Sequence, residues 1–519
     1  MRIAPRTHAP VREYRRGLPF LRNGHSVRLL LEMRPALEGH AGIPQENRLL
    51  FRALCTIDDY DVQGLLQSGS RVLAPGLTVE RGEMLSSLPT DDAIDRLSRV
   101  VISLQPPSTN ERLARKWGTL LSILSPLVAV YKGLFGHMLA IDGFDPQHFK
   151  DFVWRSLFAK TLPPSDMALV TARMLRVLRM PYGAMHAAGL VTARIGRSCY
   201  PILDTAGVDV MIAQTPYPGS LRTPTRLIVR YMDAVPMFQP HTISRRSFHQ
   251  ASHYAALRRN VNEGAWFACA SEASRKDLLA IFPQAEPRAV VIHCMLAHQN
   301  LLDVEEPERV GEVLSKHRQT ISGVSLSPAD DIPLAPEYLL MVSTLEPRKN
   351  HEMLIRAWER LRRGAWPNLK IVIVGSLGWD YEGIIRELSP WLRSGDAFLL
   401  GNVPARELRV LYRYARLTIC PSVAEGFDYS GVEAMSCGGV VAASDIAVHR
   451  EVFADAAEYF DPYDENAAAK KLSALLLSSA EHHRTVLVEA GRRVAERYEP
   501  KVLLPLWQEL IRRVKEDDQ

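Results

Sequence analysis

The sequence contains few cysteines, and their arrangement indicates neither a metal site nor a disulfide framework. The chain has 519 residues and six cysteines, which lie far apart, with no Cys-x-x-Cys pair and no histidines at zinc-finger spacing. Cysteines scattered in this way are typical of reduced, mostly buried thiols in the cytoplasm. We therefore expect a cytoplasmic protein with no metal ion and no other cofactor.

The sequence also lacks an apolar run long enough to cross a membrane. The most apolar stretch, Leu120–Tyr131, is interrupted by Ser122, Ser125 and Pro126, whereas a membrane span needs about 20 apolar residues. Near the arginine-rich N-terminus the only apolar stretch is Leu18–Leu21, which is much shorter than the hydrophobic region of a signal peptide. We expect neither secretion nor a spanning helix.

No long run of one charge is present. The formal net charge of +5 is small for this length, and the basic residues do not cluster with interleaved aromatics, so nucleic-acid binding is not expected. One local pattern is basic: Thr171–Met180 spaces Arg173, Arg176 and Arg179 beside apolar residues. It predicts either a surface helix of the fold or a basic amphipathic helix in peripheral contact with the inner face of the cytoplasmic membrane.

The hydrophobic pattern predicts an α/β protein of two domains. The chain is too long for one core, since domains run to roughly 100–200 residues. Short β-branched runs alternate twice with helical patterns, which favours parallel sheets covered by helices on both faces. In the first half the expected strands are Val27–Met33, Arg71–Ala74, Val208–Ala213, Arg226–Met232, Ala265–Ser271 and Ala289–Cys294. In the second half they are Tyr338–Ser343, Lys370–Val374, Phe398–Leu400, Leu417–Cys420 and Val440–Ser444.

We expect the chain to divide into four parts. An N-terminal domain at 1–300 carries a mostly helical insertion at about 75–207. A polar linker with scattered prolines at 301–336 leads to the C-terminal domain at 337–497, and a helix lies within 498–519. Doubly wound sheets bind ligands at the carboxyl ends of their strands, so the site is expected there.

Two glutamates follow the strand that ends at Cys420. Glu425 lies on the loop at the rim of the sheet, and Glu433 lies on a short helix that begins near Ser430 and Gly431. The start of that helix suits a diphosphate, because backbone N–H groups and the helix dipole favour an anion there. The carboxylates then accept hydrogen bonds from sugar or ribose hydroxyls. The residues alone leave open a second interpretation, with Glu433 an ordinary first-turn acid and Glu425 a solvated loop residue.

A basic pair, Arg348 and Lys349, follows the first strand of the second domain and precedes Asn350, a good N-cap for the next helix. Two cations near a helix start can neutralise a leaving diphosphate without a divalent ion. Taken alone, such a pair also fits ordinary surface charge.

Two glycine loops follow strands. Gly375 comes after Lys370–Val374, but no G-x-G-x-x-G spacing is present, so hydride-transfer chemistry is disfavoured. Gly42 and Ile43 lead into a predicted helix at Glu46–Leu54. Close approach to a substrate and an ordinary turn are both compatible with that loop.

The second half, from Met341 to about Pro462, resembles the donor-binding domain of family 4 retaining glycosyltransferases with the GT-B fold. The matching segments are VSTLEPRKNHEMLI, IVIVG, LLGNVPARELRVLYRYA, CPSVAEGFDYSGVEAMSCGGVVAAS and HREVFADAAEYFDPYD. The resemblance implies an α/β fold of two Rossmann-like doubly wound domains facing a cleft, with the C-terminal helix crossing back to the first domain.

The resemblance also implies residue roles in the second domain. Glu425 and Glu433 form an E-x7-E element that places the first at the donor sugar and the second at the nucleotide ribose. Arg348 and Lys349 match a basic pair on the diphosphate, and with Glu425 they are the expected catalytic residues. The other expected donor-binding residues are Asn402 and Val403 facing the base, Gly426 and Phe427 beneath the sugar, and Ser430, Gly431 and Gly375.

The first half resembles the family more loosely. Gly42 and Ile43 match an acceptor-side glycine loop, and Arg230–Pro236 looks like a His-Asp-x-x-Pro stretch. Asp233 matches the aspartate, but Met232 stands where the family has a histidine that contacts the donor sugar. Because a thioether neither donates a hydrogen bond nor moves a proton, altered or reduced activity is an open alternative.

The resemblance implies a retaining, metal-independent hexosyltransferase. It would move a sugar, with GDP-mannose the favoured donor, to a glycan or lipid-linked acceptor in cell-surface polysaccharide or O-antigen biosynthesis. Met232 motivates an alternative, a non-catalytic sugar-nucleotide-binding subunit of a polysaccharide assembly complex. A nucleotide-sugar epimerase on the same fold is a third interpretation, and the E-x7-E element argues against it.

Overall fold

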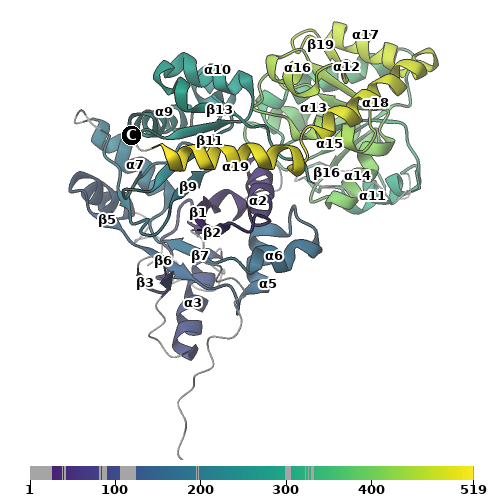
Figure 1. Cartoon of the computed structure of the whole chain (residues 1–519). Coiled ribbons are helices and arrows are strands. Elements are labelled where there is room, and N and C mark those ends of the chain that lie inside the picture. Colours follow the sequence, from purple (N-terminus) through teal and green to yellow (C-terminus); the bar gives the residue numbers. More distant parts are fainter. Residues whose placement is uncertain are drawn as a thin grey trace, which may run out of the picture.

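The chain folds into two α/β domains, each built on a mostly parallel sheet with helices on both faces (Figure 1). The computed structural model describes residues 26–37, 39, 42–80, 83–84, 90–105, 124–194, 196, 198–297, 306–321, 323–324, 326–328 and 332–517. The arginine-rich N-terminus and part of the apolar stretch at 120–131 lie outside them. No described helix is both long and apolar enough to cross a bilayer.

The first domain is built on an eight-stranded sheet, parallel except for its edge strand β6. In sheet order the strands are β13 (Ala289–Val291), β12 (Trp266–Cys269), β11 (Arg226–Tyr231), β9 (Val210–Ala213), β1 (Val27–Glu32), β2 (Tyr60–Leu66), β7 (Leu175–Leu178) and β6 (Ile141–Phe144). β1, the first described strand, thus lies in the middle of the sheet, and the later strands lie on both sides of it.

The segment at about 75–207 is predicted to be a mostly helical insertion, and this prediction is wrong in one respect, because the segment also contributes strands to the main sheet. β7 pairs in parallel with β2, and β6 pairs with β7, so this segment completes one half of the sheet. The predicted basic helix at Thr171–Met180 contains β7 instead. Arg176 lies buried in that strand and donates from Nε to Gln63 Oε1 at 2.6 Å. The spacing of the arginines matches the period of a helix, but the segment does not form one.

Helices cover both faces of the first sheet. They are α1 (Arg34–Leu37), α2 (Ile43–Leu54), α3 (Thr90–Leu104), α5 (Lys150–Val153), α6 (Met167–Thr171), α7 (Tyr182–Ala193), α8 (Val235–Phe238), α9 (Arg246–Asn262) and α10 (Glu272–Ile281). A small sheet of β10 (Ser220–Leu221), β8 (Ile202–Leu203) and β5 (Met138–Leu139) lies beside them. β3 (Val79–Glu80) and β4 (Glu83–Met84) form a short antiparallel pair.

The second domain has a six-stranded parallel sheet in the order β16-β15-β14-β17-β18-β19. Its strands are β14 (Tyr338–Val342), β15 (Lys370–Val374), β16 (Ala397–Leu400), β17 (Leu417–Cys420), β18 (Val441–Ser444) and β19 (Ala457–Phe460). β14 lies at the centre of this sheet. β15 and β16 follow it to one edge, and β17, β18 and β19 form the other half. In such a sheet, ligands bind where the strand order reverses, which here lies between β14 and β17.

The helices of the second domain are α11 (Arg309–His317), α12 (His351–Arg363), α13 (Glu382–Ser394), α14 (Ala405–Tyr414), α15 (Tyr429–Ser436), α16 (Ala447–Phe453), α17 (Glu465–Leu476) and α18 (Glu481–Glu496). α11 lies within the predicted linker and packs against α14, where Lys316 Nζ bonds Glu407 Oε1 at 2.6 Å. This part of the predicted linker therefore belongs to the second domain.

The last helix, α19 (Pro500–Glu516), runs back along the first domain, where it contacts α2, β9 and β11 (Figure 1). Trp507 on α19 is fully buried, and Trp266 Nε1 of β12 donates to Asp517 Oδ2 at 3.0 Å. The last helix thus ties the two domains together.

Candidate functional site

The strand-order reversal of the second sheet brings the predicted basic pair and the first glutamate together. Arg348 and Lys349 lie on the loop after β14, and Glu425 lies on the loop after β17. The two loops are joined directly, since Val423 N donates to Arg348 O at 2.9 Å. The carboxylate of Glu425 receives Lys349 Nζ on one oxygen and Arg348 Nη1 at 2.9 Å on the other.

Glu425 is held ionised inside this cluster. Its side chain is only 6% exposed. Burial by itself raises the pKa of Glu425, but Lys349 and Arg348 outweigh burial and bring the pKa below its ordinary value. Arg348 also pairs through Nε with Glu346 Oε1 at 2.6 Å. For Arg348, burial lowers the pKa, but the carboxylates of Glu425, Glu346 and Asp233 raise it overall.

Asn350 does not cap α12 with its side chain, contrary to the prediction. Its backbone has φ 62°, in the left-handed region, and makes no side-chain cap bond. Its Nδ2 instead donates to Pro421 O at 3.1 Å and Pro462 O at 2.8 Å. Asn350 therefore fastens the loop after β14 to the neighbouring loops, which fixes the position of the basic pair.

Helix α15 begins at Tyr429, earlier than predicted, and Asp428 is its N-cap. Asp428 Oδ1 accepts both the N–H of Ser430, at 3.0 Å, and its hydroxyl, at 2.6 Å. His449 Nε2 lies 3.1 Å from Asp428 Oδ2. Ser430 N–H is therefore not free for a diphosphate. Gly431 has a packing role, because a Cβ there would lie 2.3 Å from the ring of Phe453.

Glu433 lies at the junction of the two domains. Its Oε1 accepts from Gln45 Nε2 of α2 at 2.7 Å, and its Oε2 accepts from Tyr412 OH of α14 at 3.0 Å. Burial raises the pKa of Glu433. Beside it, Tyr429 OH donates to Glu46 Oε2 at 2.6 Å. The helix that follows the predicted acceptor loop thus touches the helix that carries the second glutamate.

Gly426 brings the donor-side loop against the first domain. A Cβ at this position would lie 2.2 Å from Met232 O and 3.4 Å from Asp233 Cβ, so only glycine fits. Met232 O also accepts from Ser274 Oγ at 2.7 Å. Phe427, next in the loop, is buried and packs edge-on against Tyr498 with ring centroids 5.0 Å apart. The Met232 and Gly426 loops are therefore in direct contact.

The first domain also holds buried polar side chains that the sequence pattern does not predict. Asp233 Oδ1 accepts from Val235 N at 3.0 Å, and its charge acts on His253 of α9. Burial lowers the pKa of His253 to about 4 and that of His186 on α7 to about 3. Among the described residues, His253 Nε2, His186 Nδ1 and both amide atoms of Gln214 have no hydrogen-bond partner. No local motif marks them, because they come from α7, α9 and the end of β9.

The remaining predicted residues lie on loops at the same edges of the two sheets. Gly375 follows β15 and cannot carry a side chain, since a Cβ would lie 1.8 Å from Ser343 O. Asn402 has φ 52°, and Val403 packs on the core. Gly42 has φ 69° with open space around its Cβ position, and it precedes Ile43, where α2 begins earlier than predicted.

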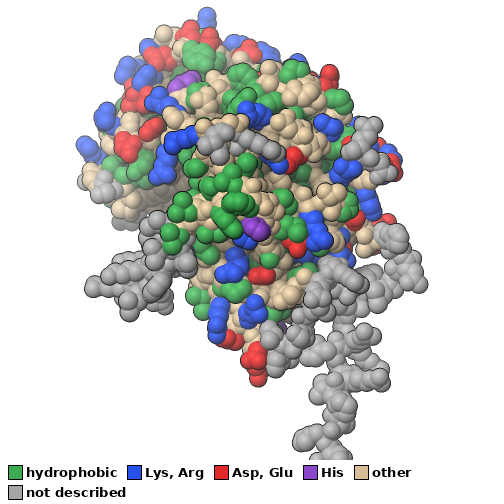
Figure 2. Space-filling model, turned by 90° about the vertical axis from the view of Figure 1, so that its left-hand side faces the viewer, with side chains coloured by type: hydrophobic (Ala, Val, Ile, Leu, Met, Phe, Trp, Pro, Cys, Tyr) green, Lys and Arg blue, Asp and Glu red, His purple; other side chains and the backbone are tan. Residues whose placement is uncertain are grey.

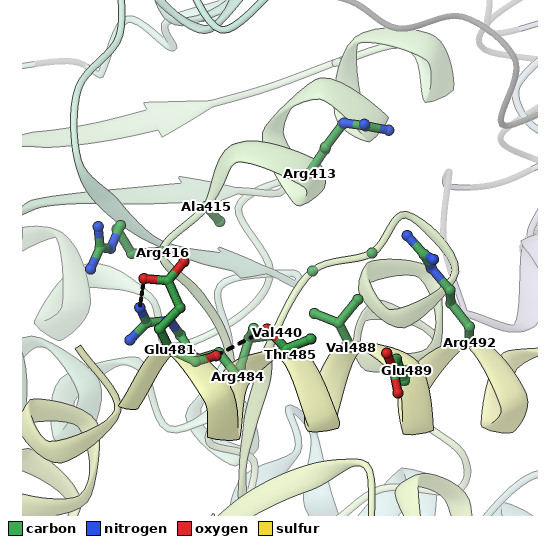
Figure 3. A pocket seen from close by; sticks show the side chains of 12 residues that line it. Arg413, Ala415, Arg416, Val440, Glu481, Arg484, Thr485, Val488, Glu489 and Arg492 are labelled. Atoms are coloured by element: carbon green, nitrogen blue, oxygen red, sulfur yellow. Dashed lines mark hydrogen bonds and ion pairs between the residues drawn. The ribbon is translucent and has the colours of Figure 1, made fainter. Parts of the chain in front are cut away.

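A surface pocket of about 440 Å³ lies at the opposite edge of the second sheet, before β17 and β18 (Figure 3). Arg416 in its wall bonds Glu337 Oε1 at 2.9 Å, and Arg484 bonds Leu475 O at 2.6 Å. Its other charged lining residues are Arg413, Arg492, Glu481 and Glu489. This pocket is separate from the candidate site. Across the described residues, no group of three or more His, Cys, Asp or Glu side chains is placed to hold a metal ion.

Residues 326–494 match the family model described as glycosyl transferases group 1. The chain contains a glycosyl transferases group 1 domain. O-antigen chain mannosyltransferase B of Escherichia coli is 32% identical over 177 residues, which cover 33% of this chain and 45% of the relative. Serotype-specific mannosyltransferase WbdA of Escherichia coli is 26% identical over 196 residues, or 37% of this chain and 24% of the relative. The chain spans less than half the length of either relative.

Solved structures are similar over nearly the whole length of the chain. A sucrose-phosphate synthase from Thermosynechococcus elongatus has a TM-score of 0.53 at 13% identity, covering 94% of this chain and 99% of that one. A glycosyltransferase from Rickettsia africae has a TM-score of 0.51 at 12% identity, covering 95% and 100%. At such identities the likeness shows the fold alone. It confirms the predicted α/β architecture, with the group 1 domain as the second of two Rossmann-like domains in the GT-B arrangement.

Proposed function

We propose that the chain is a family 4 glycosyltransferase that moves mannose from GDP-mannose to a glycan or lipid-linked acceptor of a cell-surface polysaccharide. The observation that carries the proposal is the buried cluster of Glu425, Arg348 and Lys349 at the strand-order reversal of the group 1 domain. The names of the relatives, which are O-antigen and serotype-specific mannosyltransferases, support the choice of sugar and pathway.

In the proposed mechanism the basic pair stabilises the departing diphosphate. Lys349 and Arg348 sit in a buried setting, where a charge acts more strongly than in water. They supply the positive charge that a divalent ion would otherwise provide. The acceptor attacks from the face that the diphosphate leaves, and a phosphate oxygen takes its proton, so the anomeric configuration is retained. Glu425, oriented by both cations, accepts a hydrogen bond from a sugar hydroxyl.

Glu433 is proposed to bind the ribose. Its two oxygens each accept one hydrogen bond, from Gln45 and from Tyr412, and each can accept a second. A ribose hydroxyl can therefore join these bonds or replace one of them. Because Gln45 belongs to the first domain, the proposed ribose site includes the contact between the domains, and opening and reclosing of the domains is part of the proposed cycle.

On the acceptor side, Asp233 and His253 are proposed to contact the incoming hydroxyl group. The carboxylate of Asp233 raises the pKa of Arg348 and, against the effect of burial, that of His253, which supports a position near both the donor cluster and α9. The low pKa keeps His253 neutral at pH 7, so its ring can donate and accept hydrogen bonds. In this proposal His253 offers the imidazole that Met232 does not.

The donor assignment predicts selective stabilisation by one nucleotide. At a free concentration 100 times its Kd, GDP should raise the free energy of unfolding by about 2.7 kcal/mol, because it binds only the folded state. Thermal unfolding with GDP, UDP, ADP and their mannose or glucose conjugates measures this, with Glu433→Gln as the ribose-site control. A screen in which no nucleotide shifts the transition contradicts the proposal, and a shift by UDP alone contradicts the choice of GDP-mannose.

Met232 keeps one alternative open, the non-catalytic sugar-nucleotide-binding subunit. A working enzyme should gain less than about tenfold in turnover from Met232→His, because a general acid–base group contributes about 100- to 10,000-fold only where none is present. GDP release from GDP-mannose measures the effect, with Met237→His on α8 as the matched control. A rise of more than about a hundredfold from a nearly inactive starting protein favours the binding subunit instead.

A further inference from the structure

The first turn of helix α10 donates two of its backbone N–H groups to the other domain. The side chain of its N-cap, Ser271, accepts from the N–H of Ser274. The N–H groups of Glu272, at 2.7 Å, and Ala273, at 3.2 Å, donate instead to the two carboxylate oxygens of Glu451, which lies on α16. A carboxylate is stabilised at the start of a helix by such N–H groups and by the helix dipole. The second domain therefore completes the cap of a helix in the first.

Glu451 also binds His293, which follows β13. The Nε2 atom of His293 lies 3.0 Å from Glu451 Oε1, and each of the two side chains is 21% exposed. Burial by itself raises the pKa of Glu451, but the bonds from His293 and from the two backbone N–H groups outweigh burial and bring the pKa below its ordinary value. Glu451 is therefore charged at neutral pH, the form in which its partners bind it most strongly.

His293 in turn lies against the donor-side loop, residues 421–428, which carries Glu425. The centroid of its ring lies 6.3 Å from that of Phe427 and 5.4 Å from that of Tyr498. Tyr498 lies where the two chain segments between the domains meet, because Tyr498 O accepts from Leu296 N at 2.8 Å. The contacts of Glu451 thus continue through His293 to the donor-side loop.

The same turn of α10 reaches the donor-side loop by a second route. Ser274 Oγ donates to Met232 O at 2.7 Å, and Met232 O lies so close to Gly426 that a Cβ there would be 2.2 Å away. The contacts therefore form a closed ring that spans both domains, and its members in order are Ser274, Met232, Gly426, Phe427, His293 and Glu451. A fully bonded network of this kind makes a structure more rigid than its single bonds do. Met232 takes part in it through its backbone carbonyl rather than its side chain.

We propose that Glu451 is a positioning residue for the transfer reaction, which caps α10 from the second domain, holds His293 and so fixes the donor-side loop against Met232. This role rests on the proposed function, since the loop carries Glu425, which is proposed to accept a hydrogen bond from the donor sugar. A displacement of about 1 Å between reacting groups lowers a rate by about 100-fold. The domains must therefore return to one arrangement after each opening, and the ring through Glu451 defines that arrangement.

Replacing Glu451 by glutamine tests this role, because glutamine keeps the size of the side chain and removes its charge. The turnover of GDP-mannose should fall by about 10- to 100-fold, while the Kd for GDP changes by less than about threefold. Glu451→Asp keeps the charge and should retain more turnover than Glu451→Gln. The matched control is Glu465→Gln, which removes a second-domain carboxylate that is 28% exposed and paired with Arg360, and its turnover should equal that of the wild type.

Two further measurements distinguish positioning from a general loss of stability. Ser274→Ala opens the same ring at another bond, so the double variant with Glu451→Gln should be little slower than the slower single variant. Hydrogen exchange of the full chain, which needs no substrate, should rise in Glu451→Gln at the donor-side loop and at residues 232–236. Helix α7 and strand β5 give an internal control, because they lie on the side of the first domain that faces away from the second domain, which is the side shown in Figure 2.

Any of three results overturns the proposal. The first is a Glu451→Gln variant with wild-type turnover and exchange. The second is a double variant whose loss equals the product of the two single losses, which shows that the two sites act independently. The third is an equal rise in exchange across both domains, α7 and β5 included, which shows that Glu451 only stabilises the fold. If the wild type does not turn over GDP-mannose, the proposed function fails, and the exchange result alone decides whether Glu451 fixes the donor-side loop.

Discussion

Replacing Lys349 by alanine should lower the turnover of GDP-mannose by about 100- to 1000-fold, while the Kd for GDP rises by less than about tenfold. The physical reason is that negative charge grows on the diphosphate as the glycosidic bond breaks, so a cation fixed beside it gains most in the transition state. Single-turnover release of GDP, with enzyme in excess, measures the chemical step, and calorimetry measures nucleotide binding.

The surroundings of Lys349 make this substitution interpretable. Glu425 keeps its second partner, Arg348, at 2.9 Å, so the carboxylate is not left buried without a cation. Lys316→Ala removes an exposed lysine that pairs with Glu407 and serves as the matched control, with turnover expected to stay at the wild-type level. Equal losses in turnover and GDP affinity for Lys349→Ala would show that Lys349 binds the ground state and transition state alike, which contradicts its proposed role.

The second domain follows closely from local sequence patterns. Its central strands are short, continuous apolar runs, as expected for a parallel sheet buried on both faces. The site also follows, because residues just after β14 and β17 meet wherever those strands are neighbours. Lys349 and Glu425 are 76 residues apart in the sequence, yet the strand order alone brings them together.

The first sheet was harder to predict because polar residues interrupt its strands. β2 carries Asp61 and Gln63 among apolar residues, and β7 carries Arg176. These side chains satisfy one another inside the fold: Gln63 Nε2 donates to Asp61 Oδ2 at 2.9 Å and Gln63 Oε1 accepts from Arg176. A pattern of apolar residues does not reveal such pairings. The pattern predicts a strand at Arg71–Ala74 instead, and that segment is not a strand.

No local pattern in the sequence indicates the contacts between the domains. Gln45 and Glu433 are 388 residues apart, and Glu46 and Tyr429 are 383 residues apart. The spacing of neighbouring residues predicts neither pair. Gln45 and Glu46 lie in the first turn of α2, and two polar residues at the start of a helix are as typical of a solvent-exposed helix as of a helix at an interface. These contacts determine what surrounds Glu433, the predicted ribose residue. The sequence predicts which residues form the candidate site, but it does not give the geometry of the contact between the domains.

Replacing Glu46 by alanine should lower the free energy of unfolding by about 3–5 kcal/mol, because it leaves a buried guanidinium without its counter-charge. Arg230 and Glu46 are both fully buried, with Nη2 and Oε1 2.9 Å apart. The other partners of Arg230 are neutral: the carbonyl oxygens of Ala268 and Ile292 and the sulfur of Cys294. Urea unfolding followed by tryptophan fluorescence measures the loss.

Tyr429→Phe distinguishes the effect of the buried ion pair from the effect of the hydrogen bond between the domains. It removes the hydrogen bond from Tyr429 OH to Glu46 Oε2 but keeps the ion pair, so the expected loss is only about 1 kcal/mol. Glu509→Ala breaks an exposed ion pair with Arg512 on α19 and should change stability by less than about 1 kcal/mol. If Glu46→Ala were no more destabilising than Tyr429→Phe, the buried pair would contribute little beyond its hydrogen bonds. Since Glu46 also accepts from Met295 N at 3.1 Å, a small loss would further mean that the first domain relaxes to admit water beside Arg230.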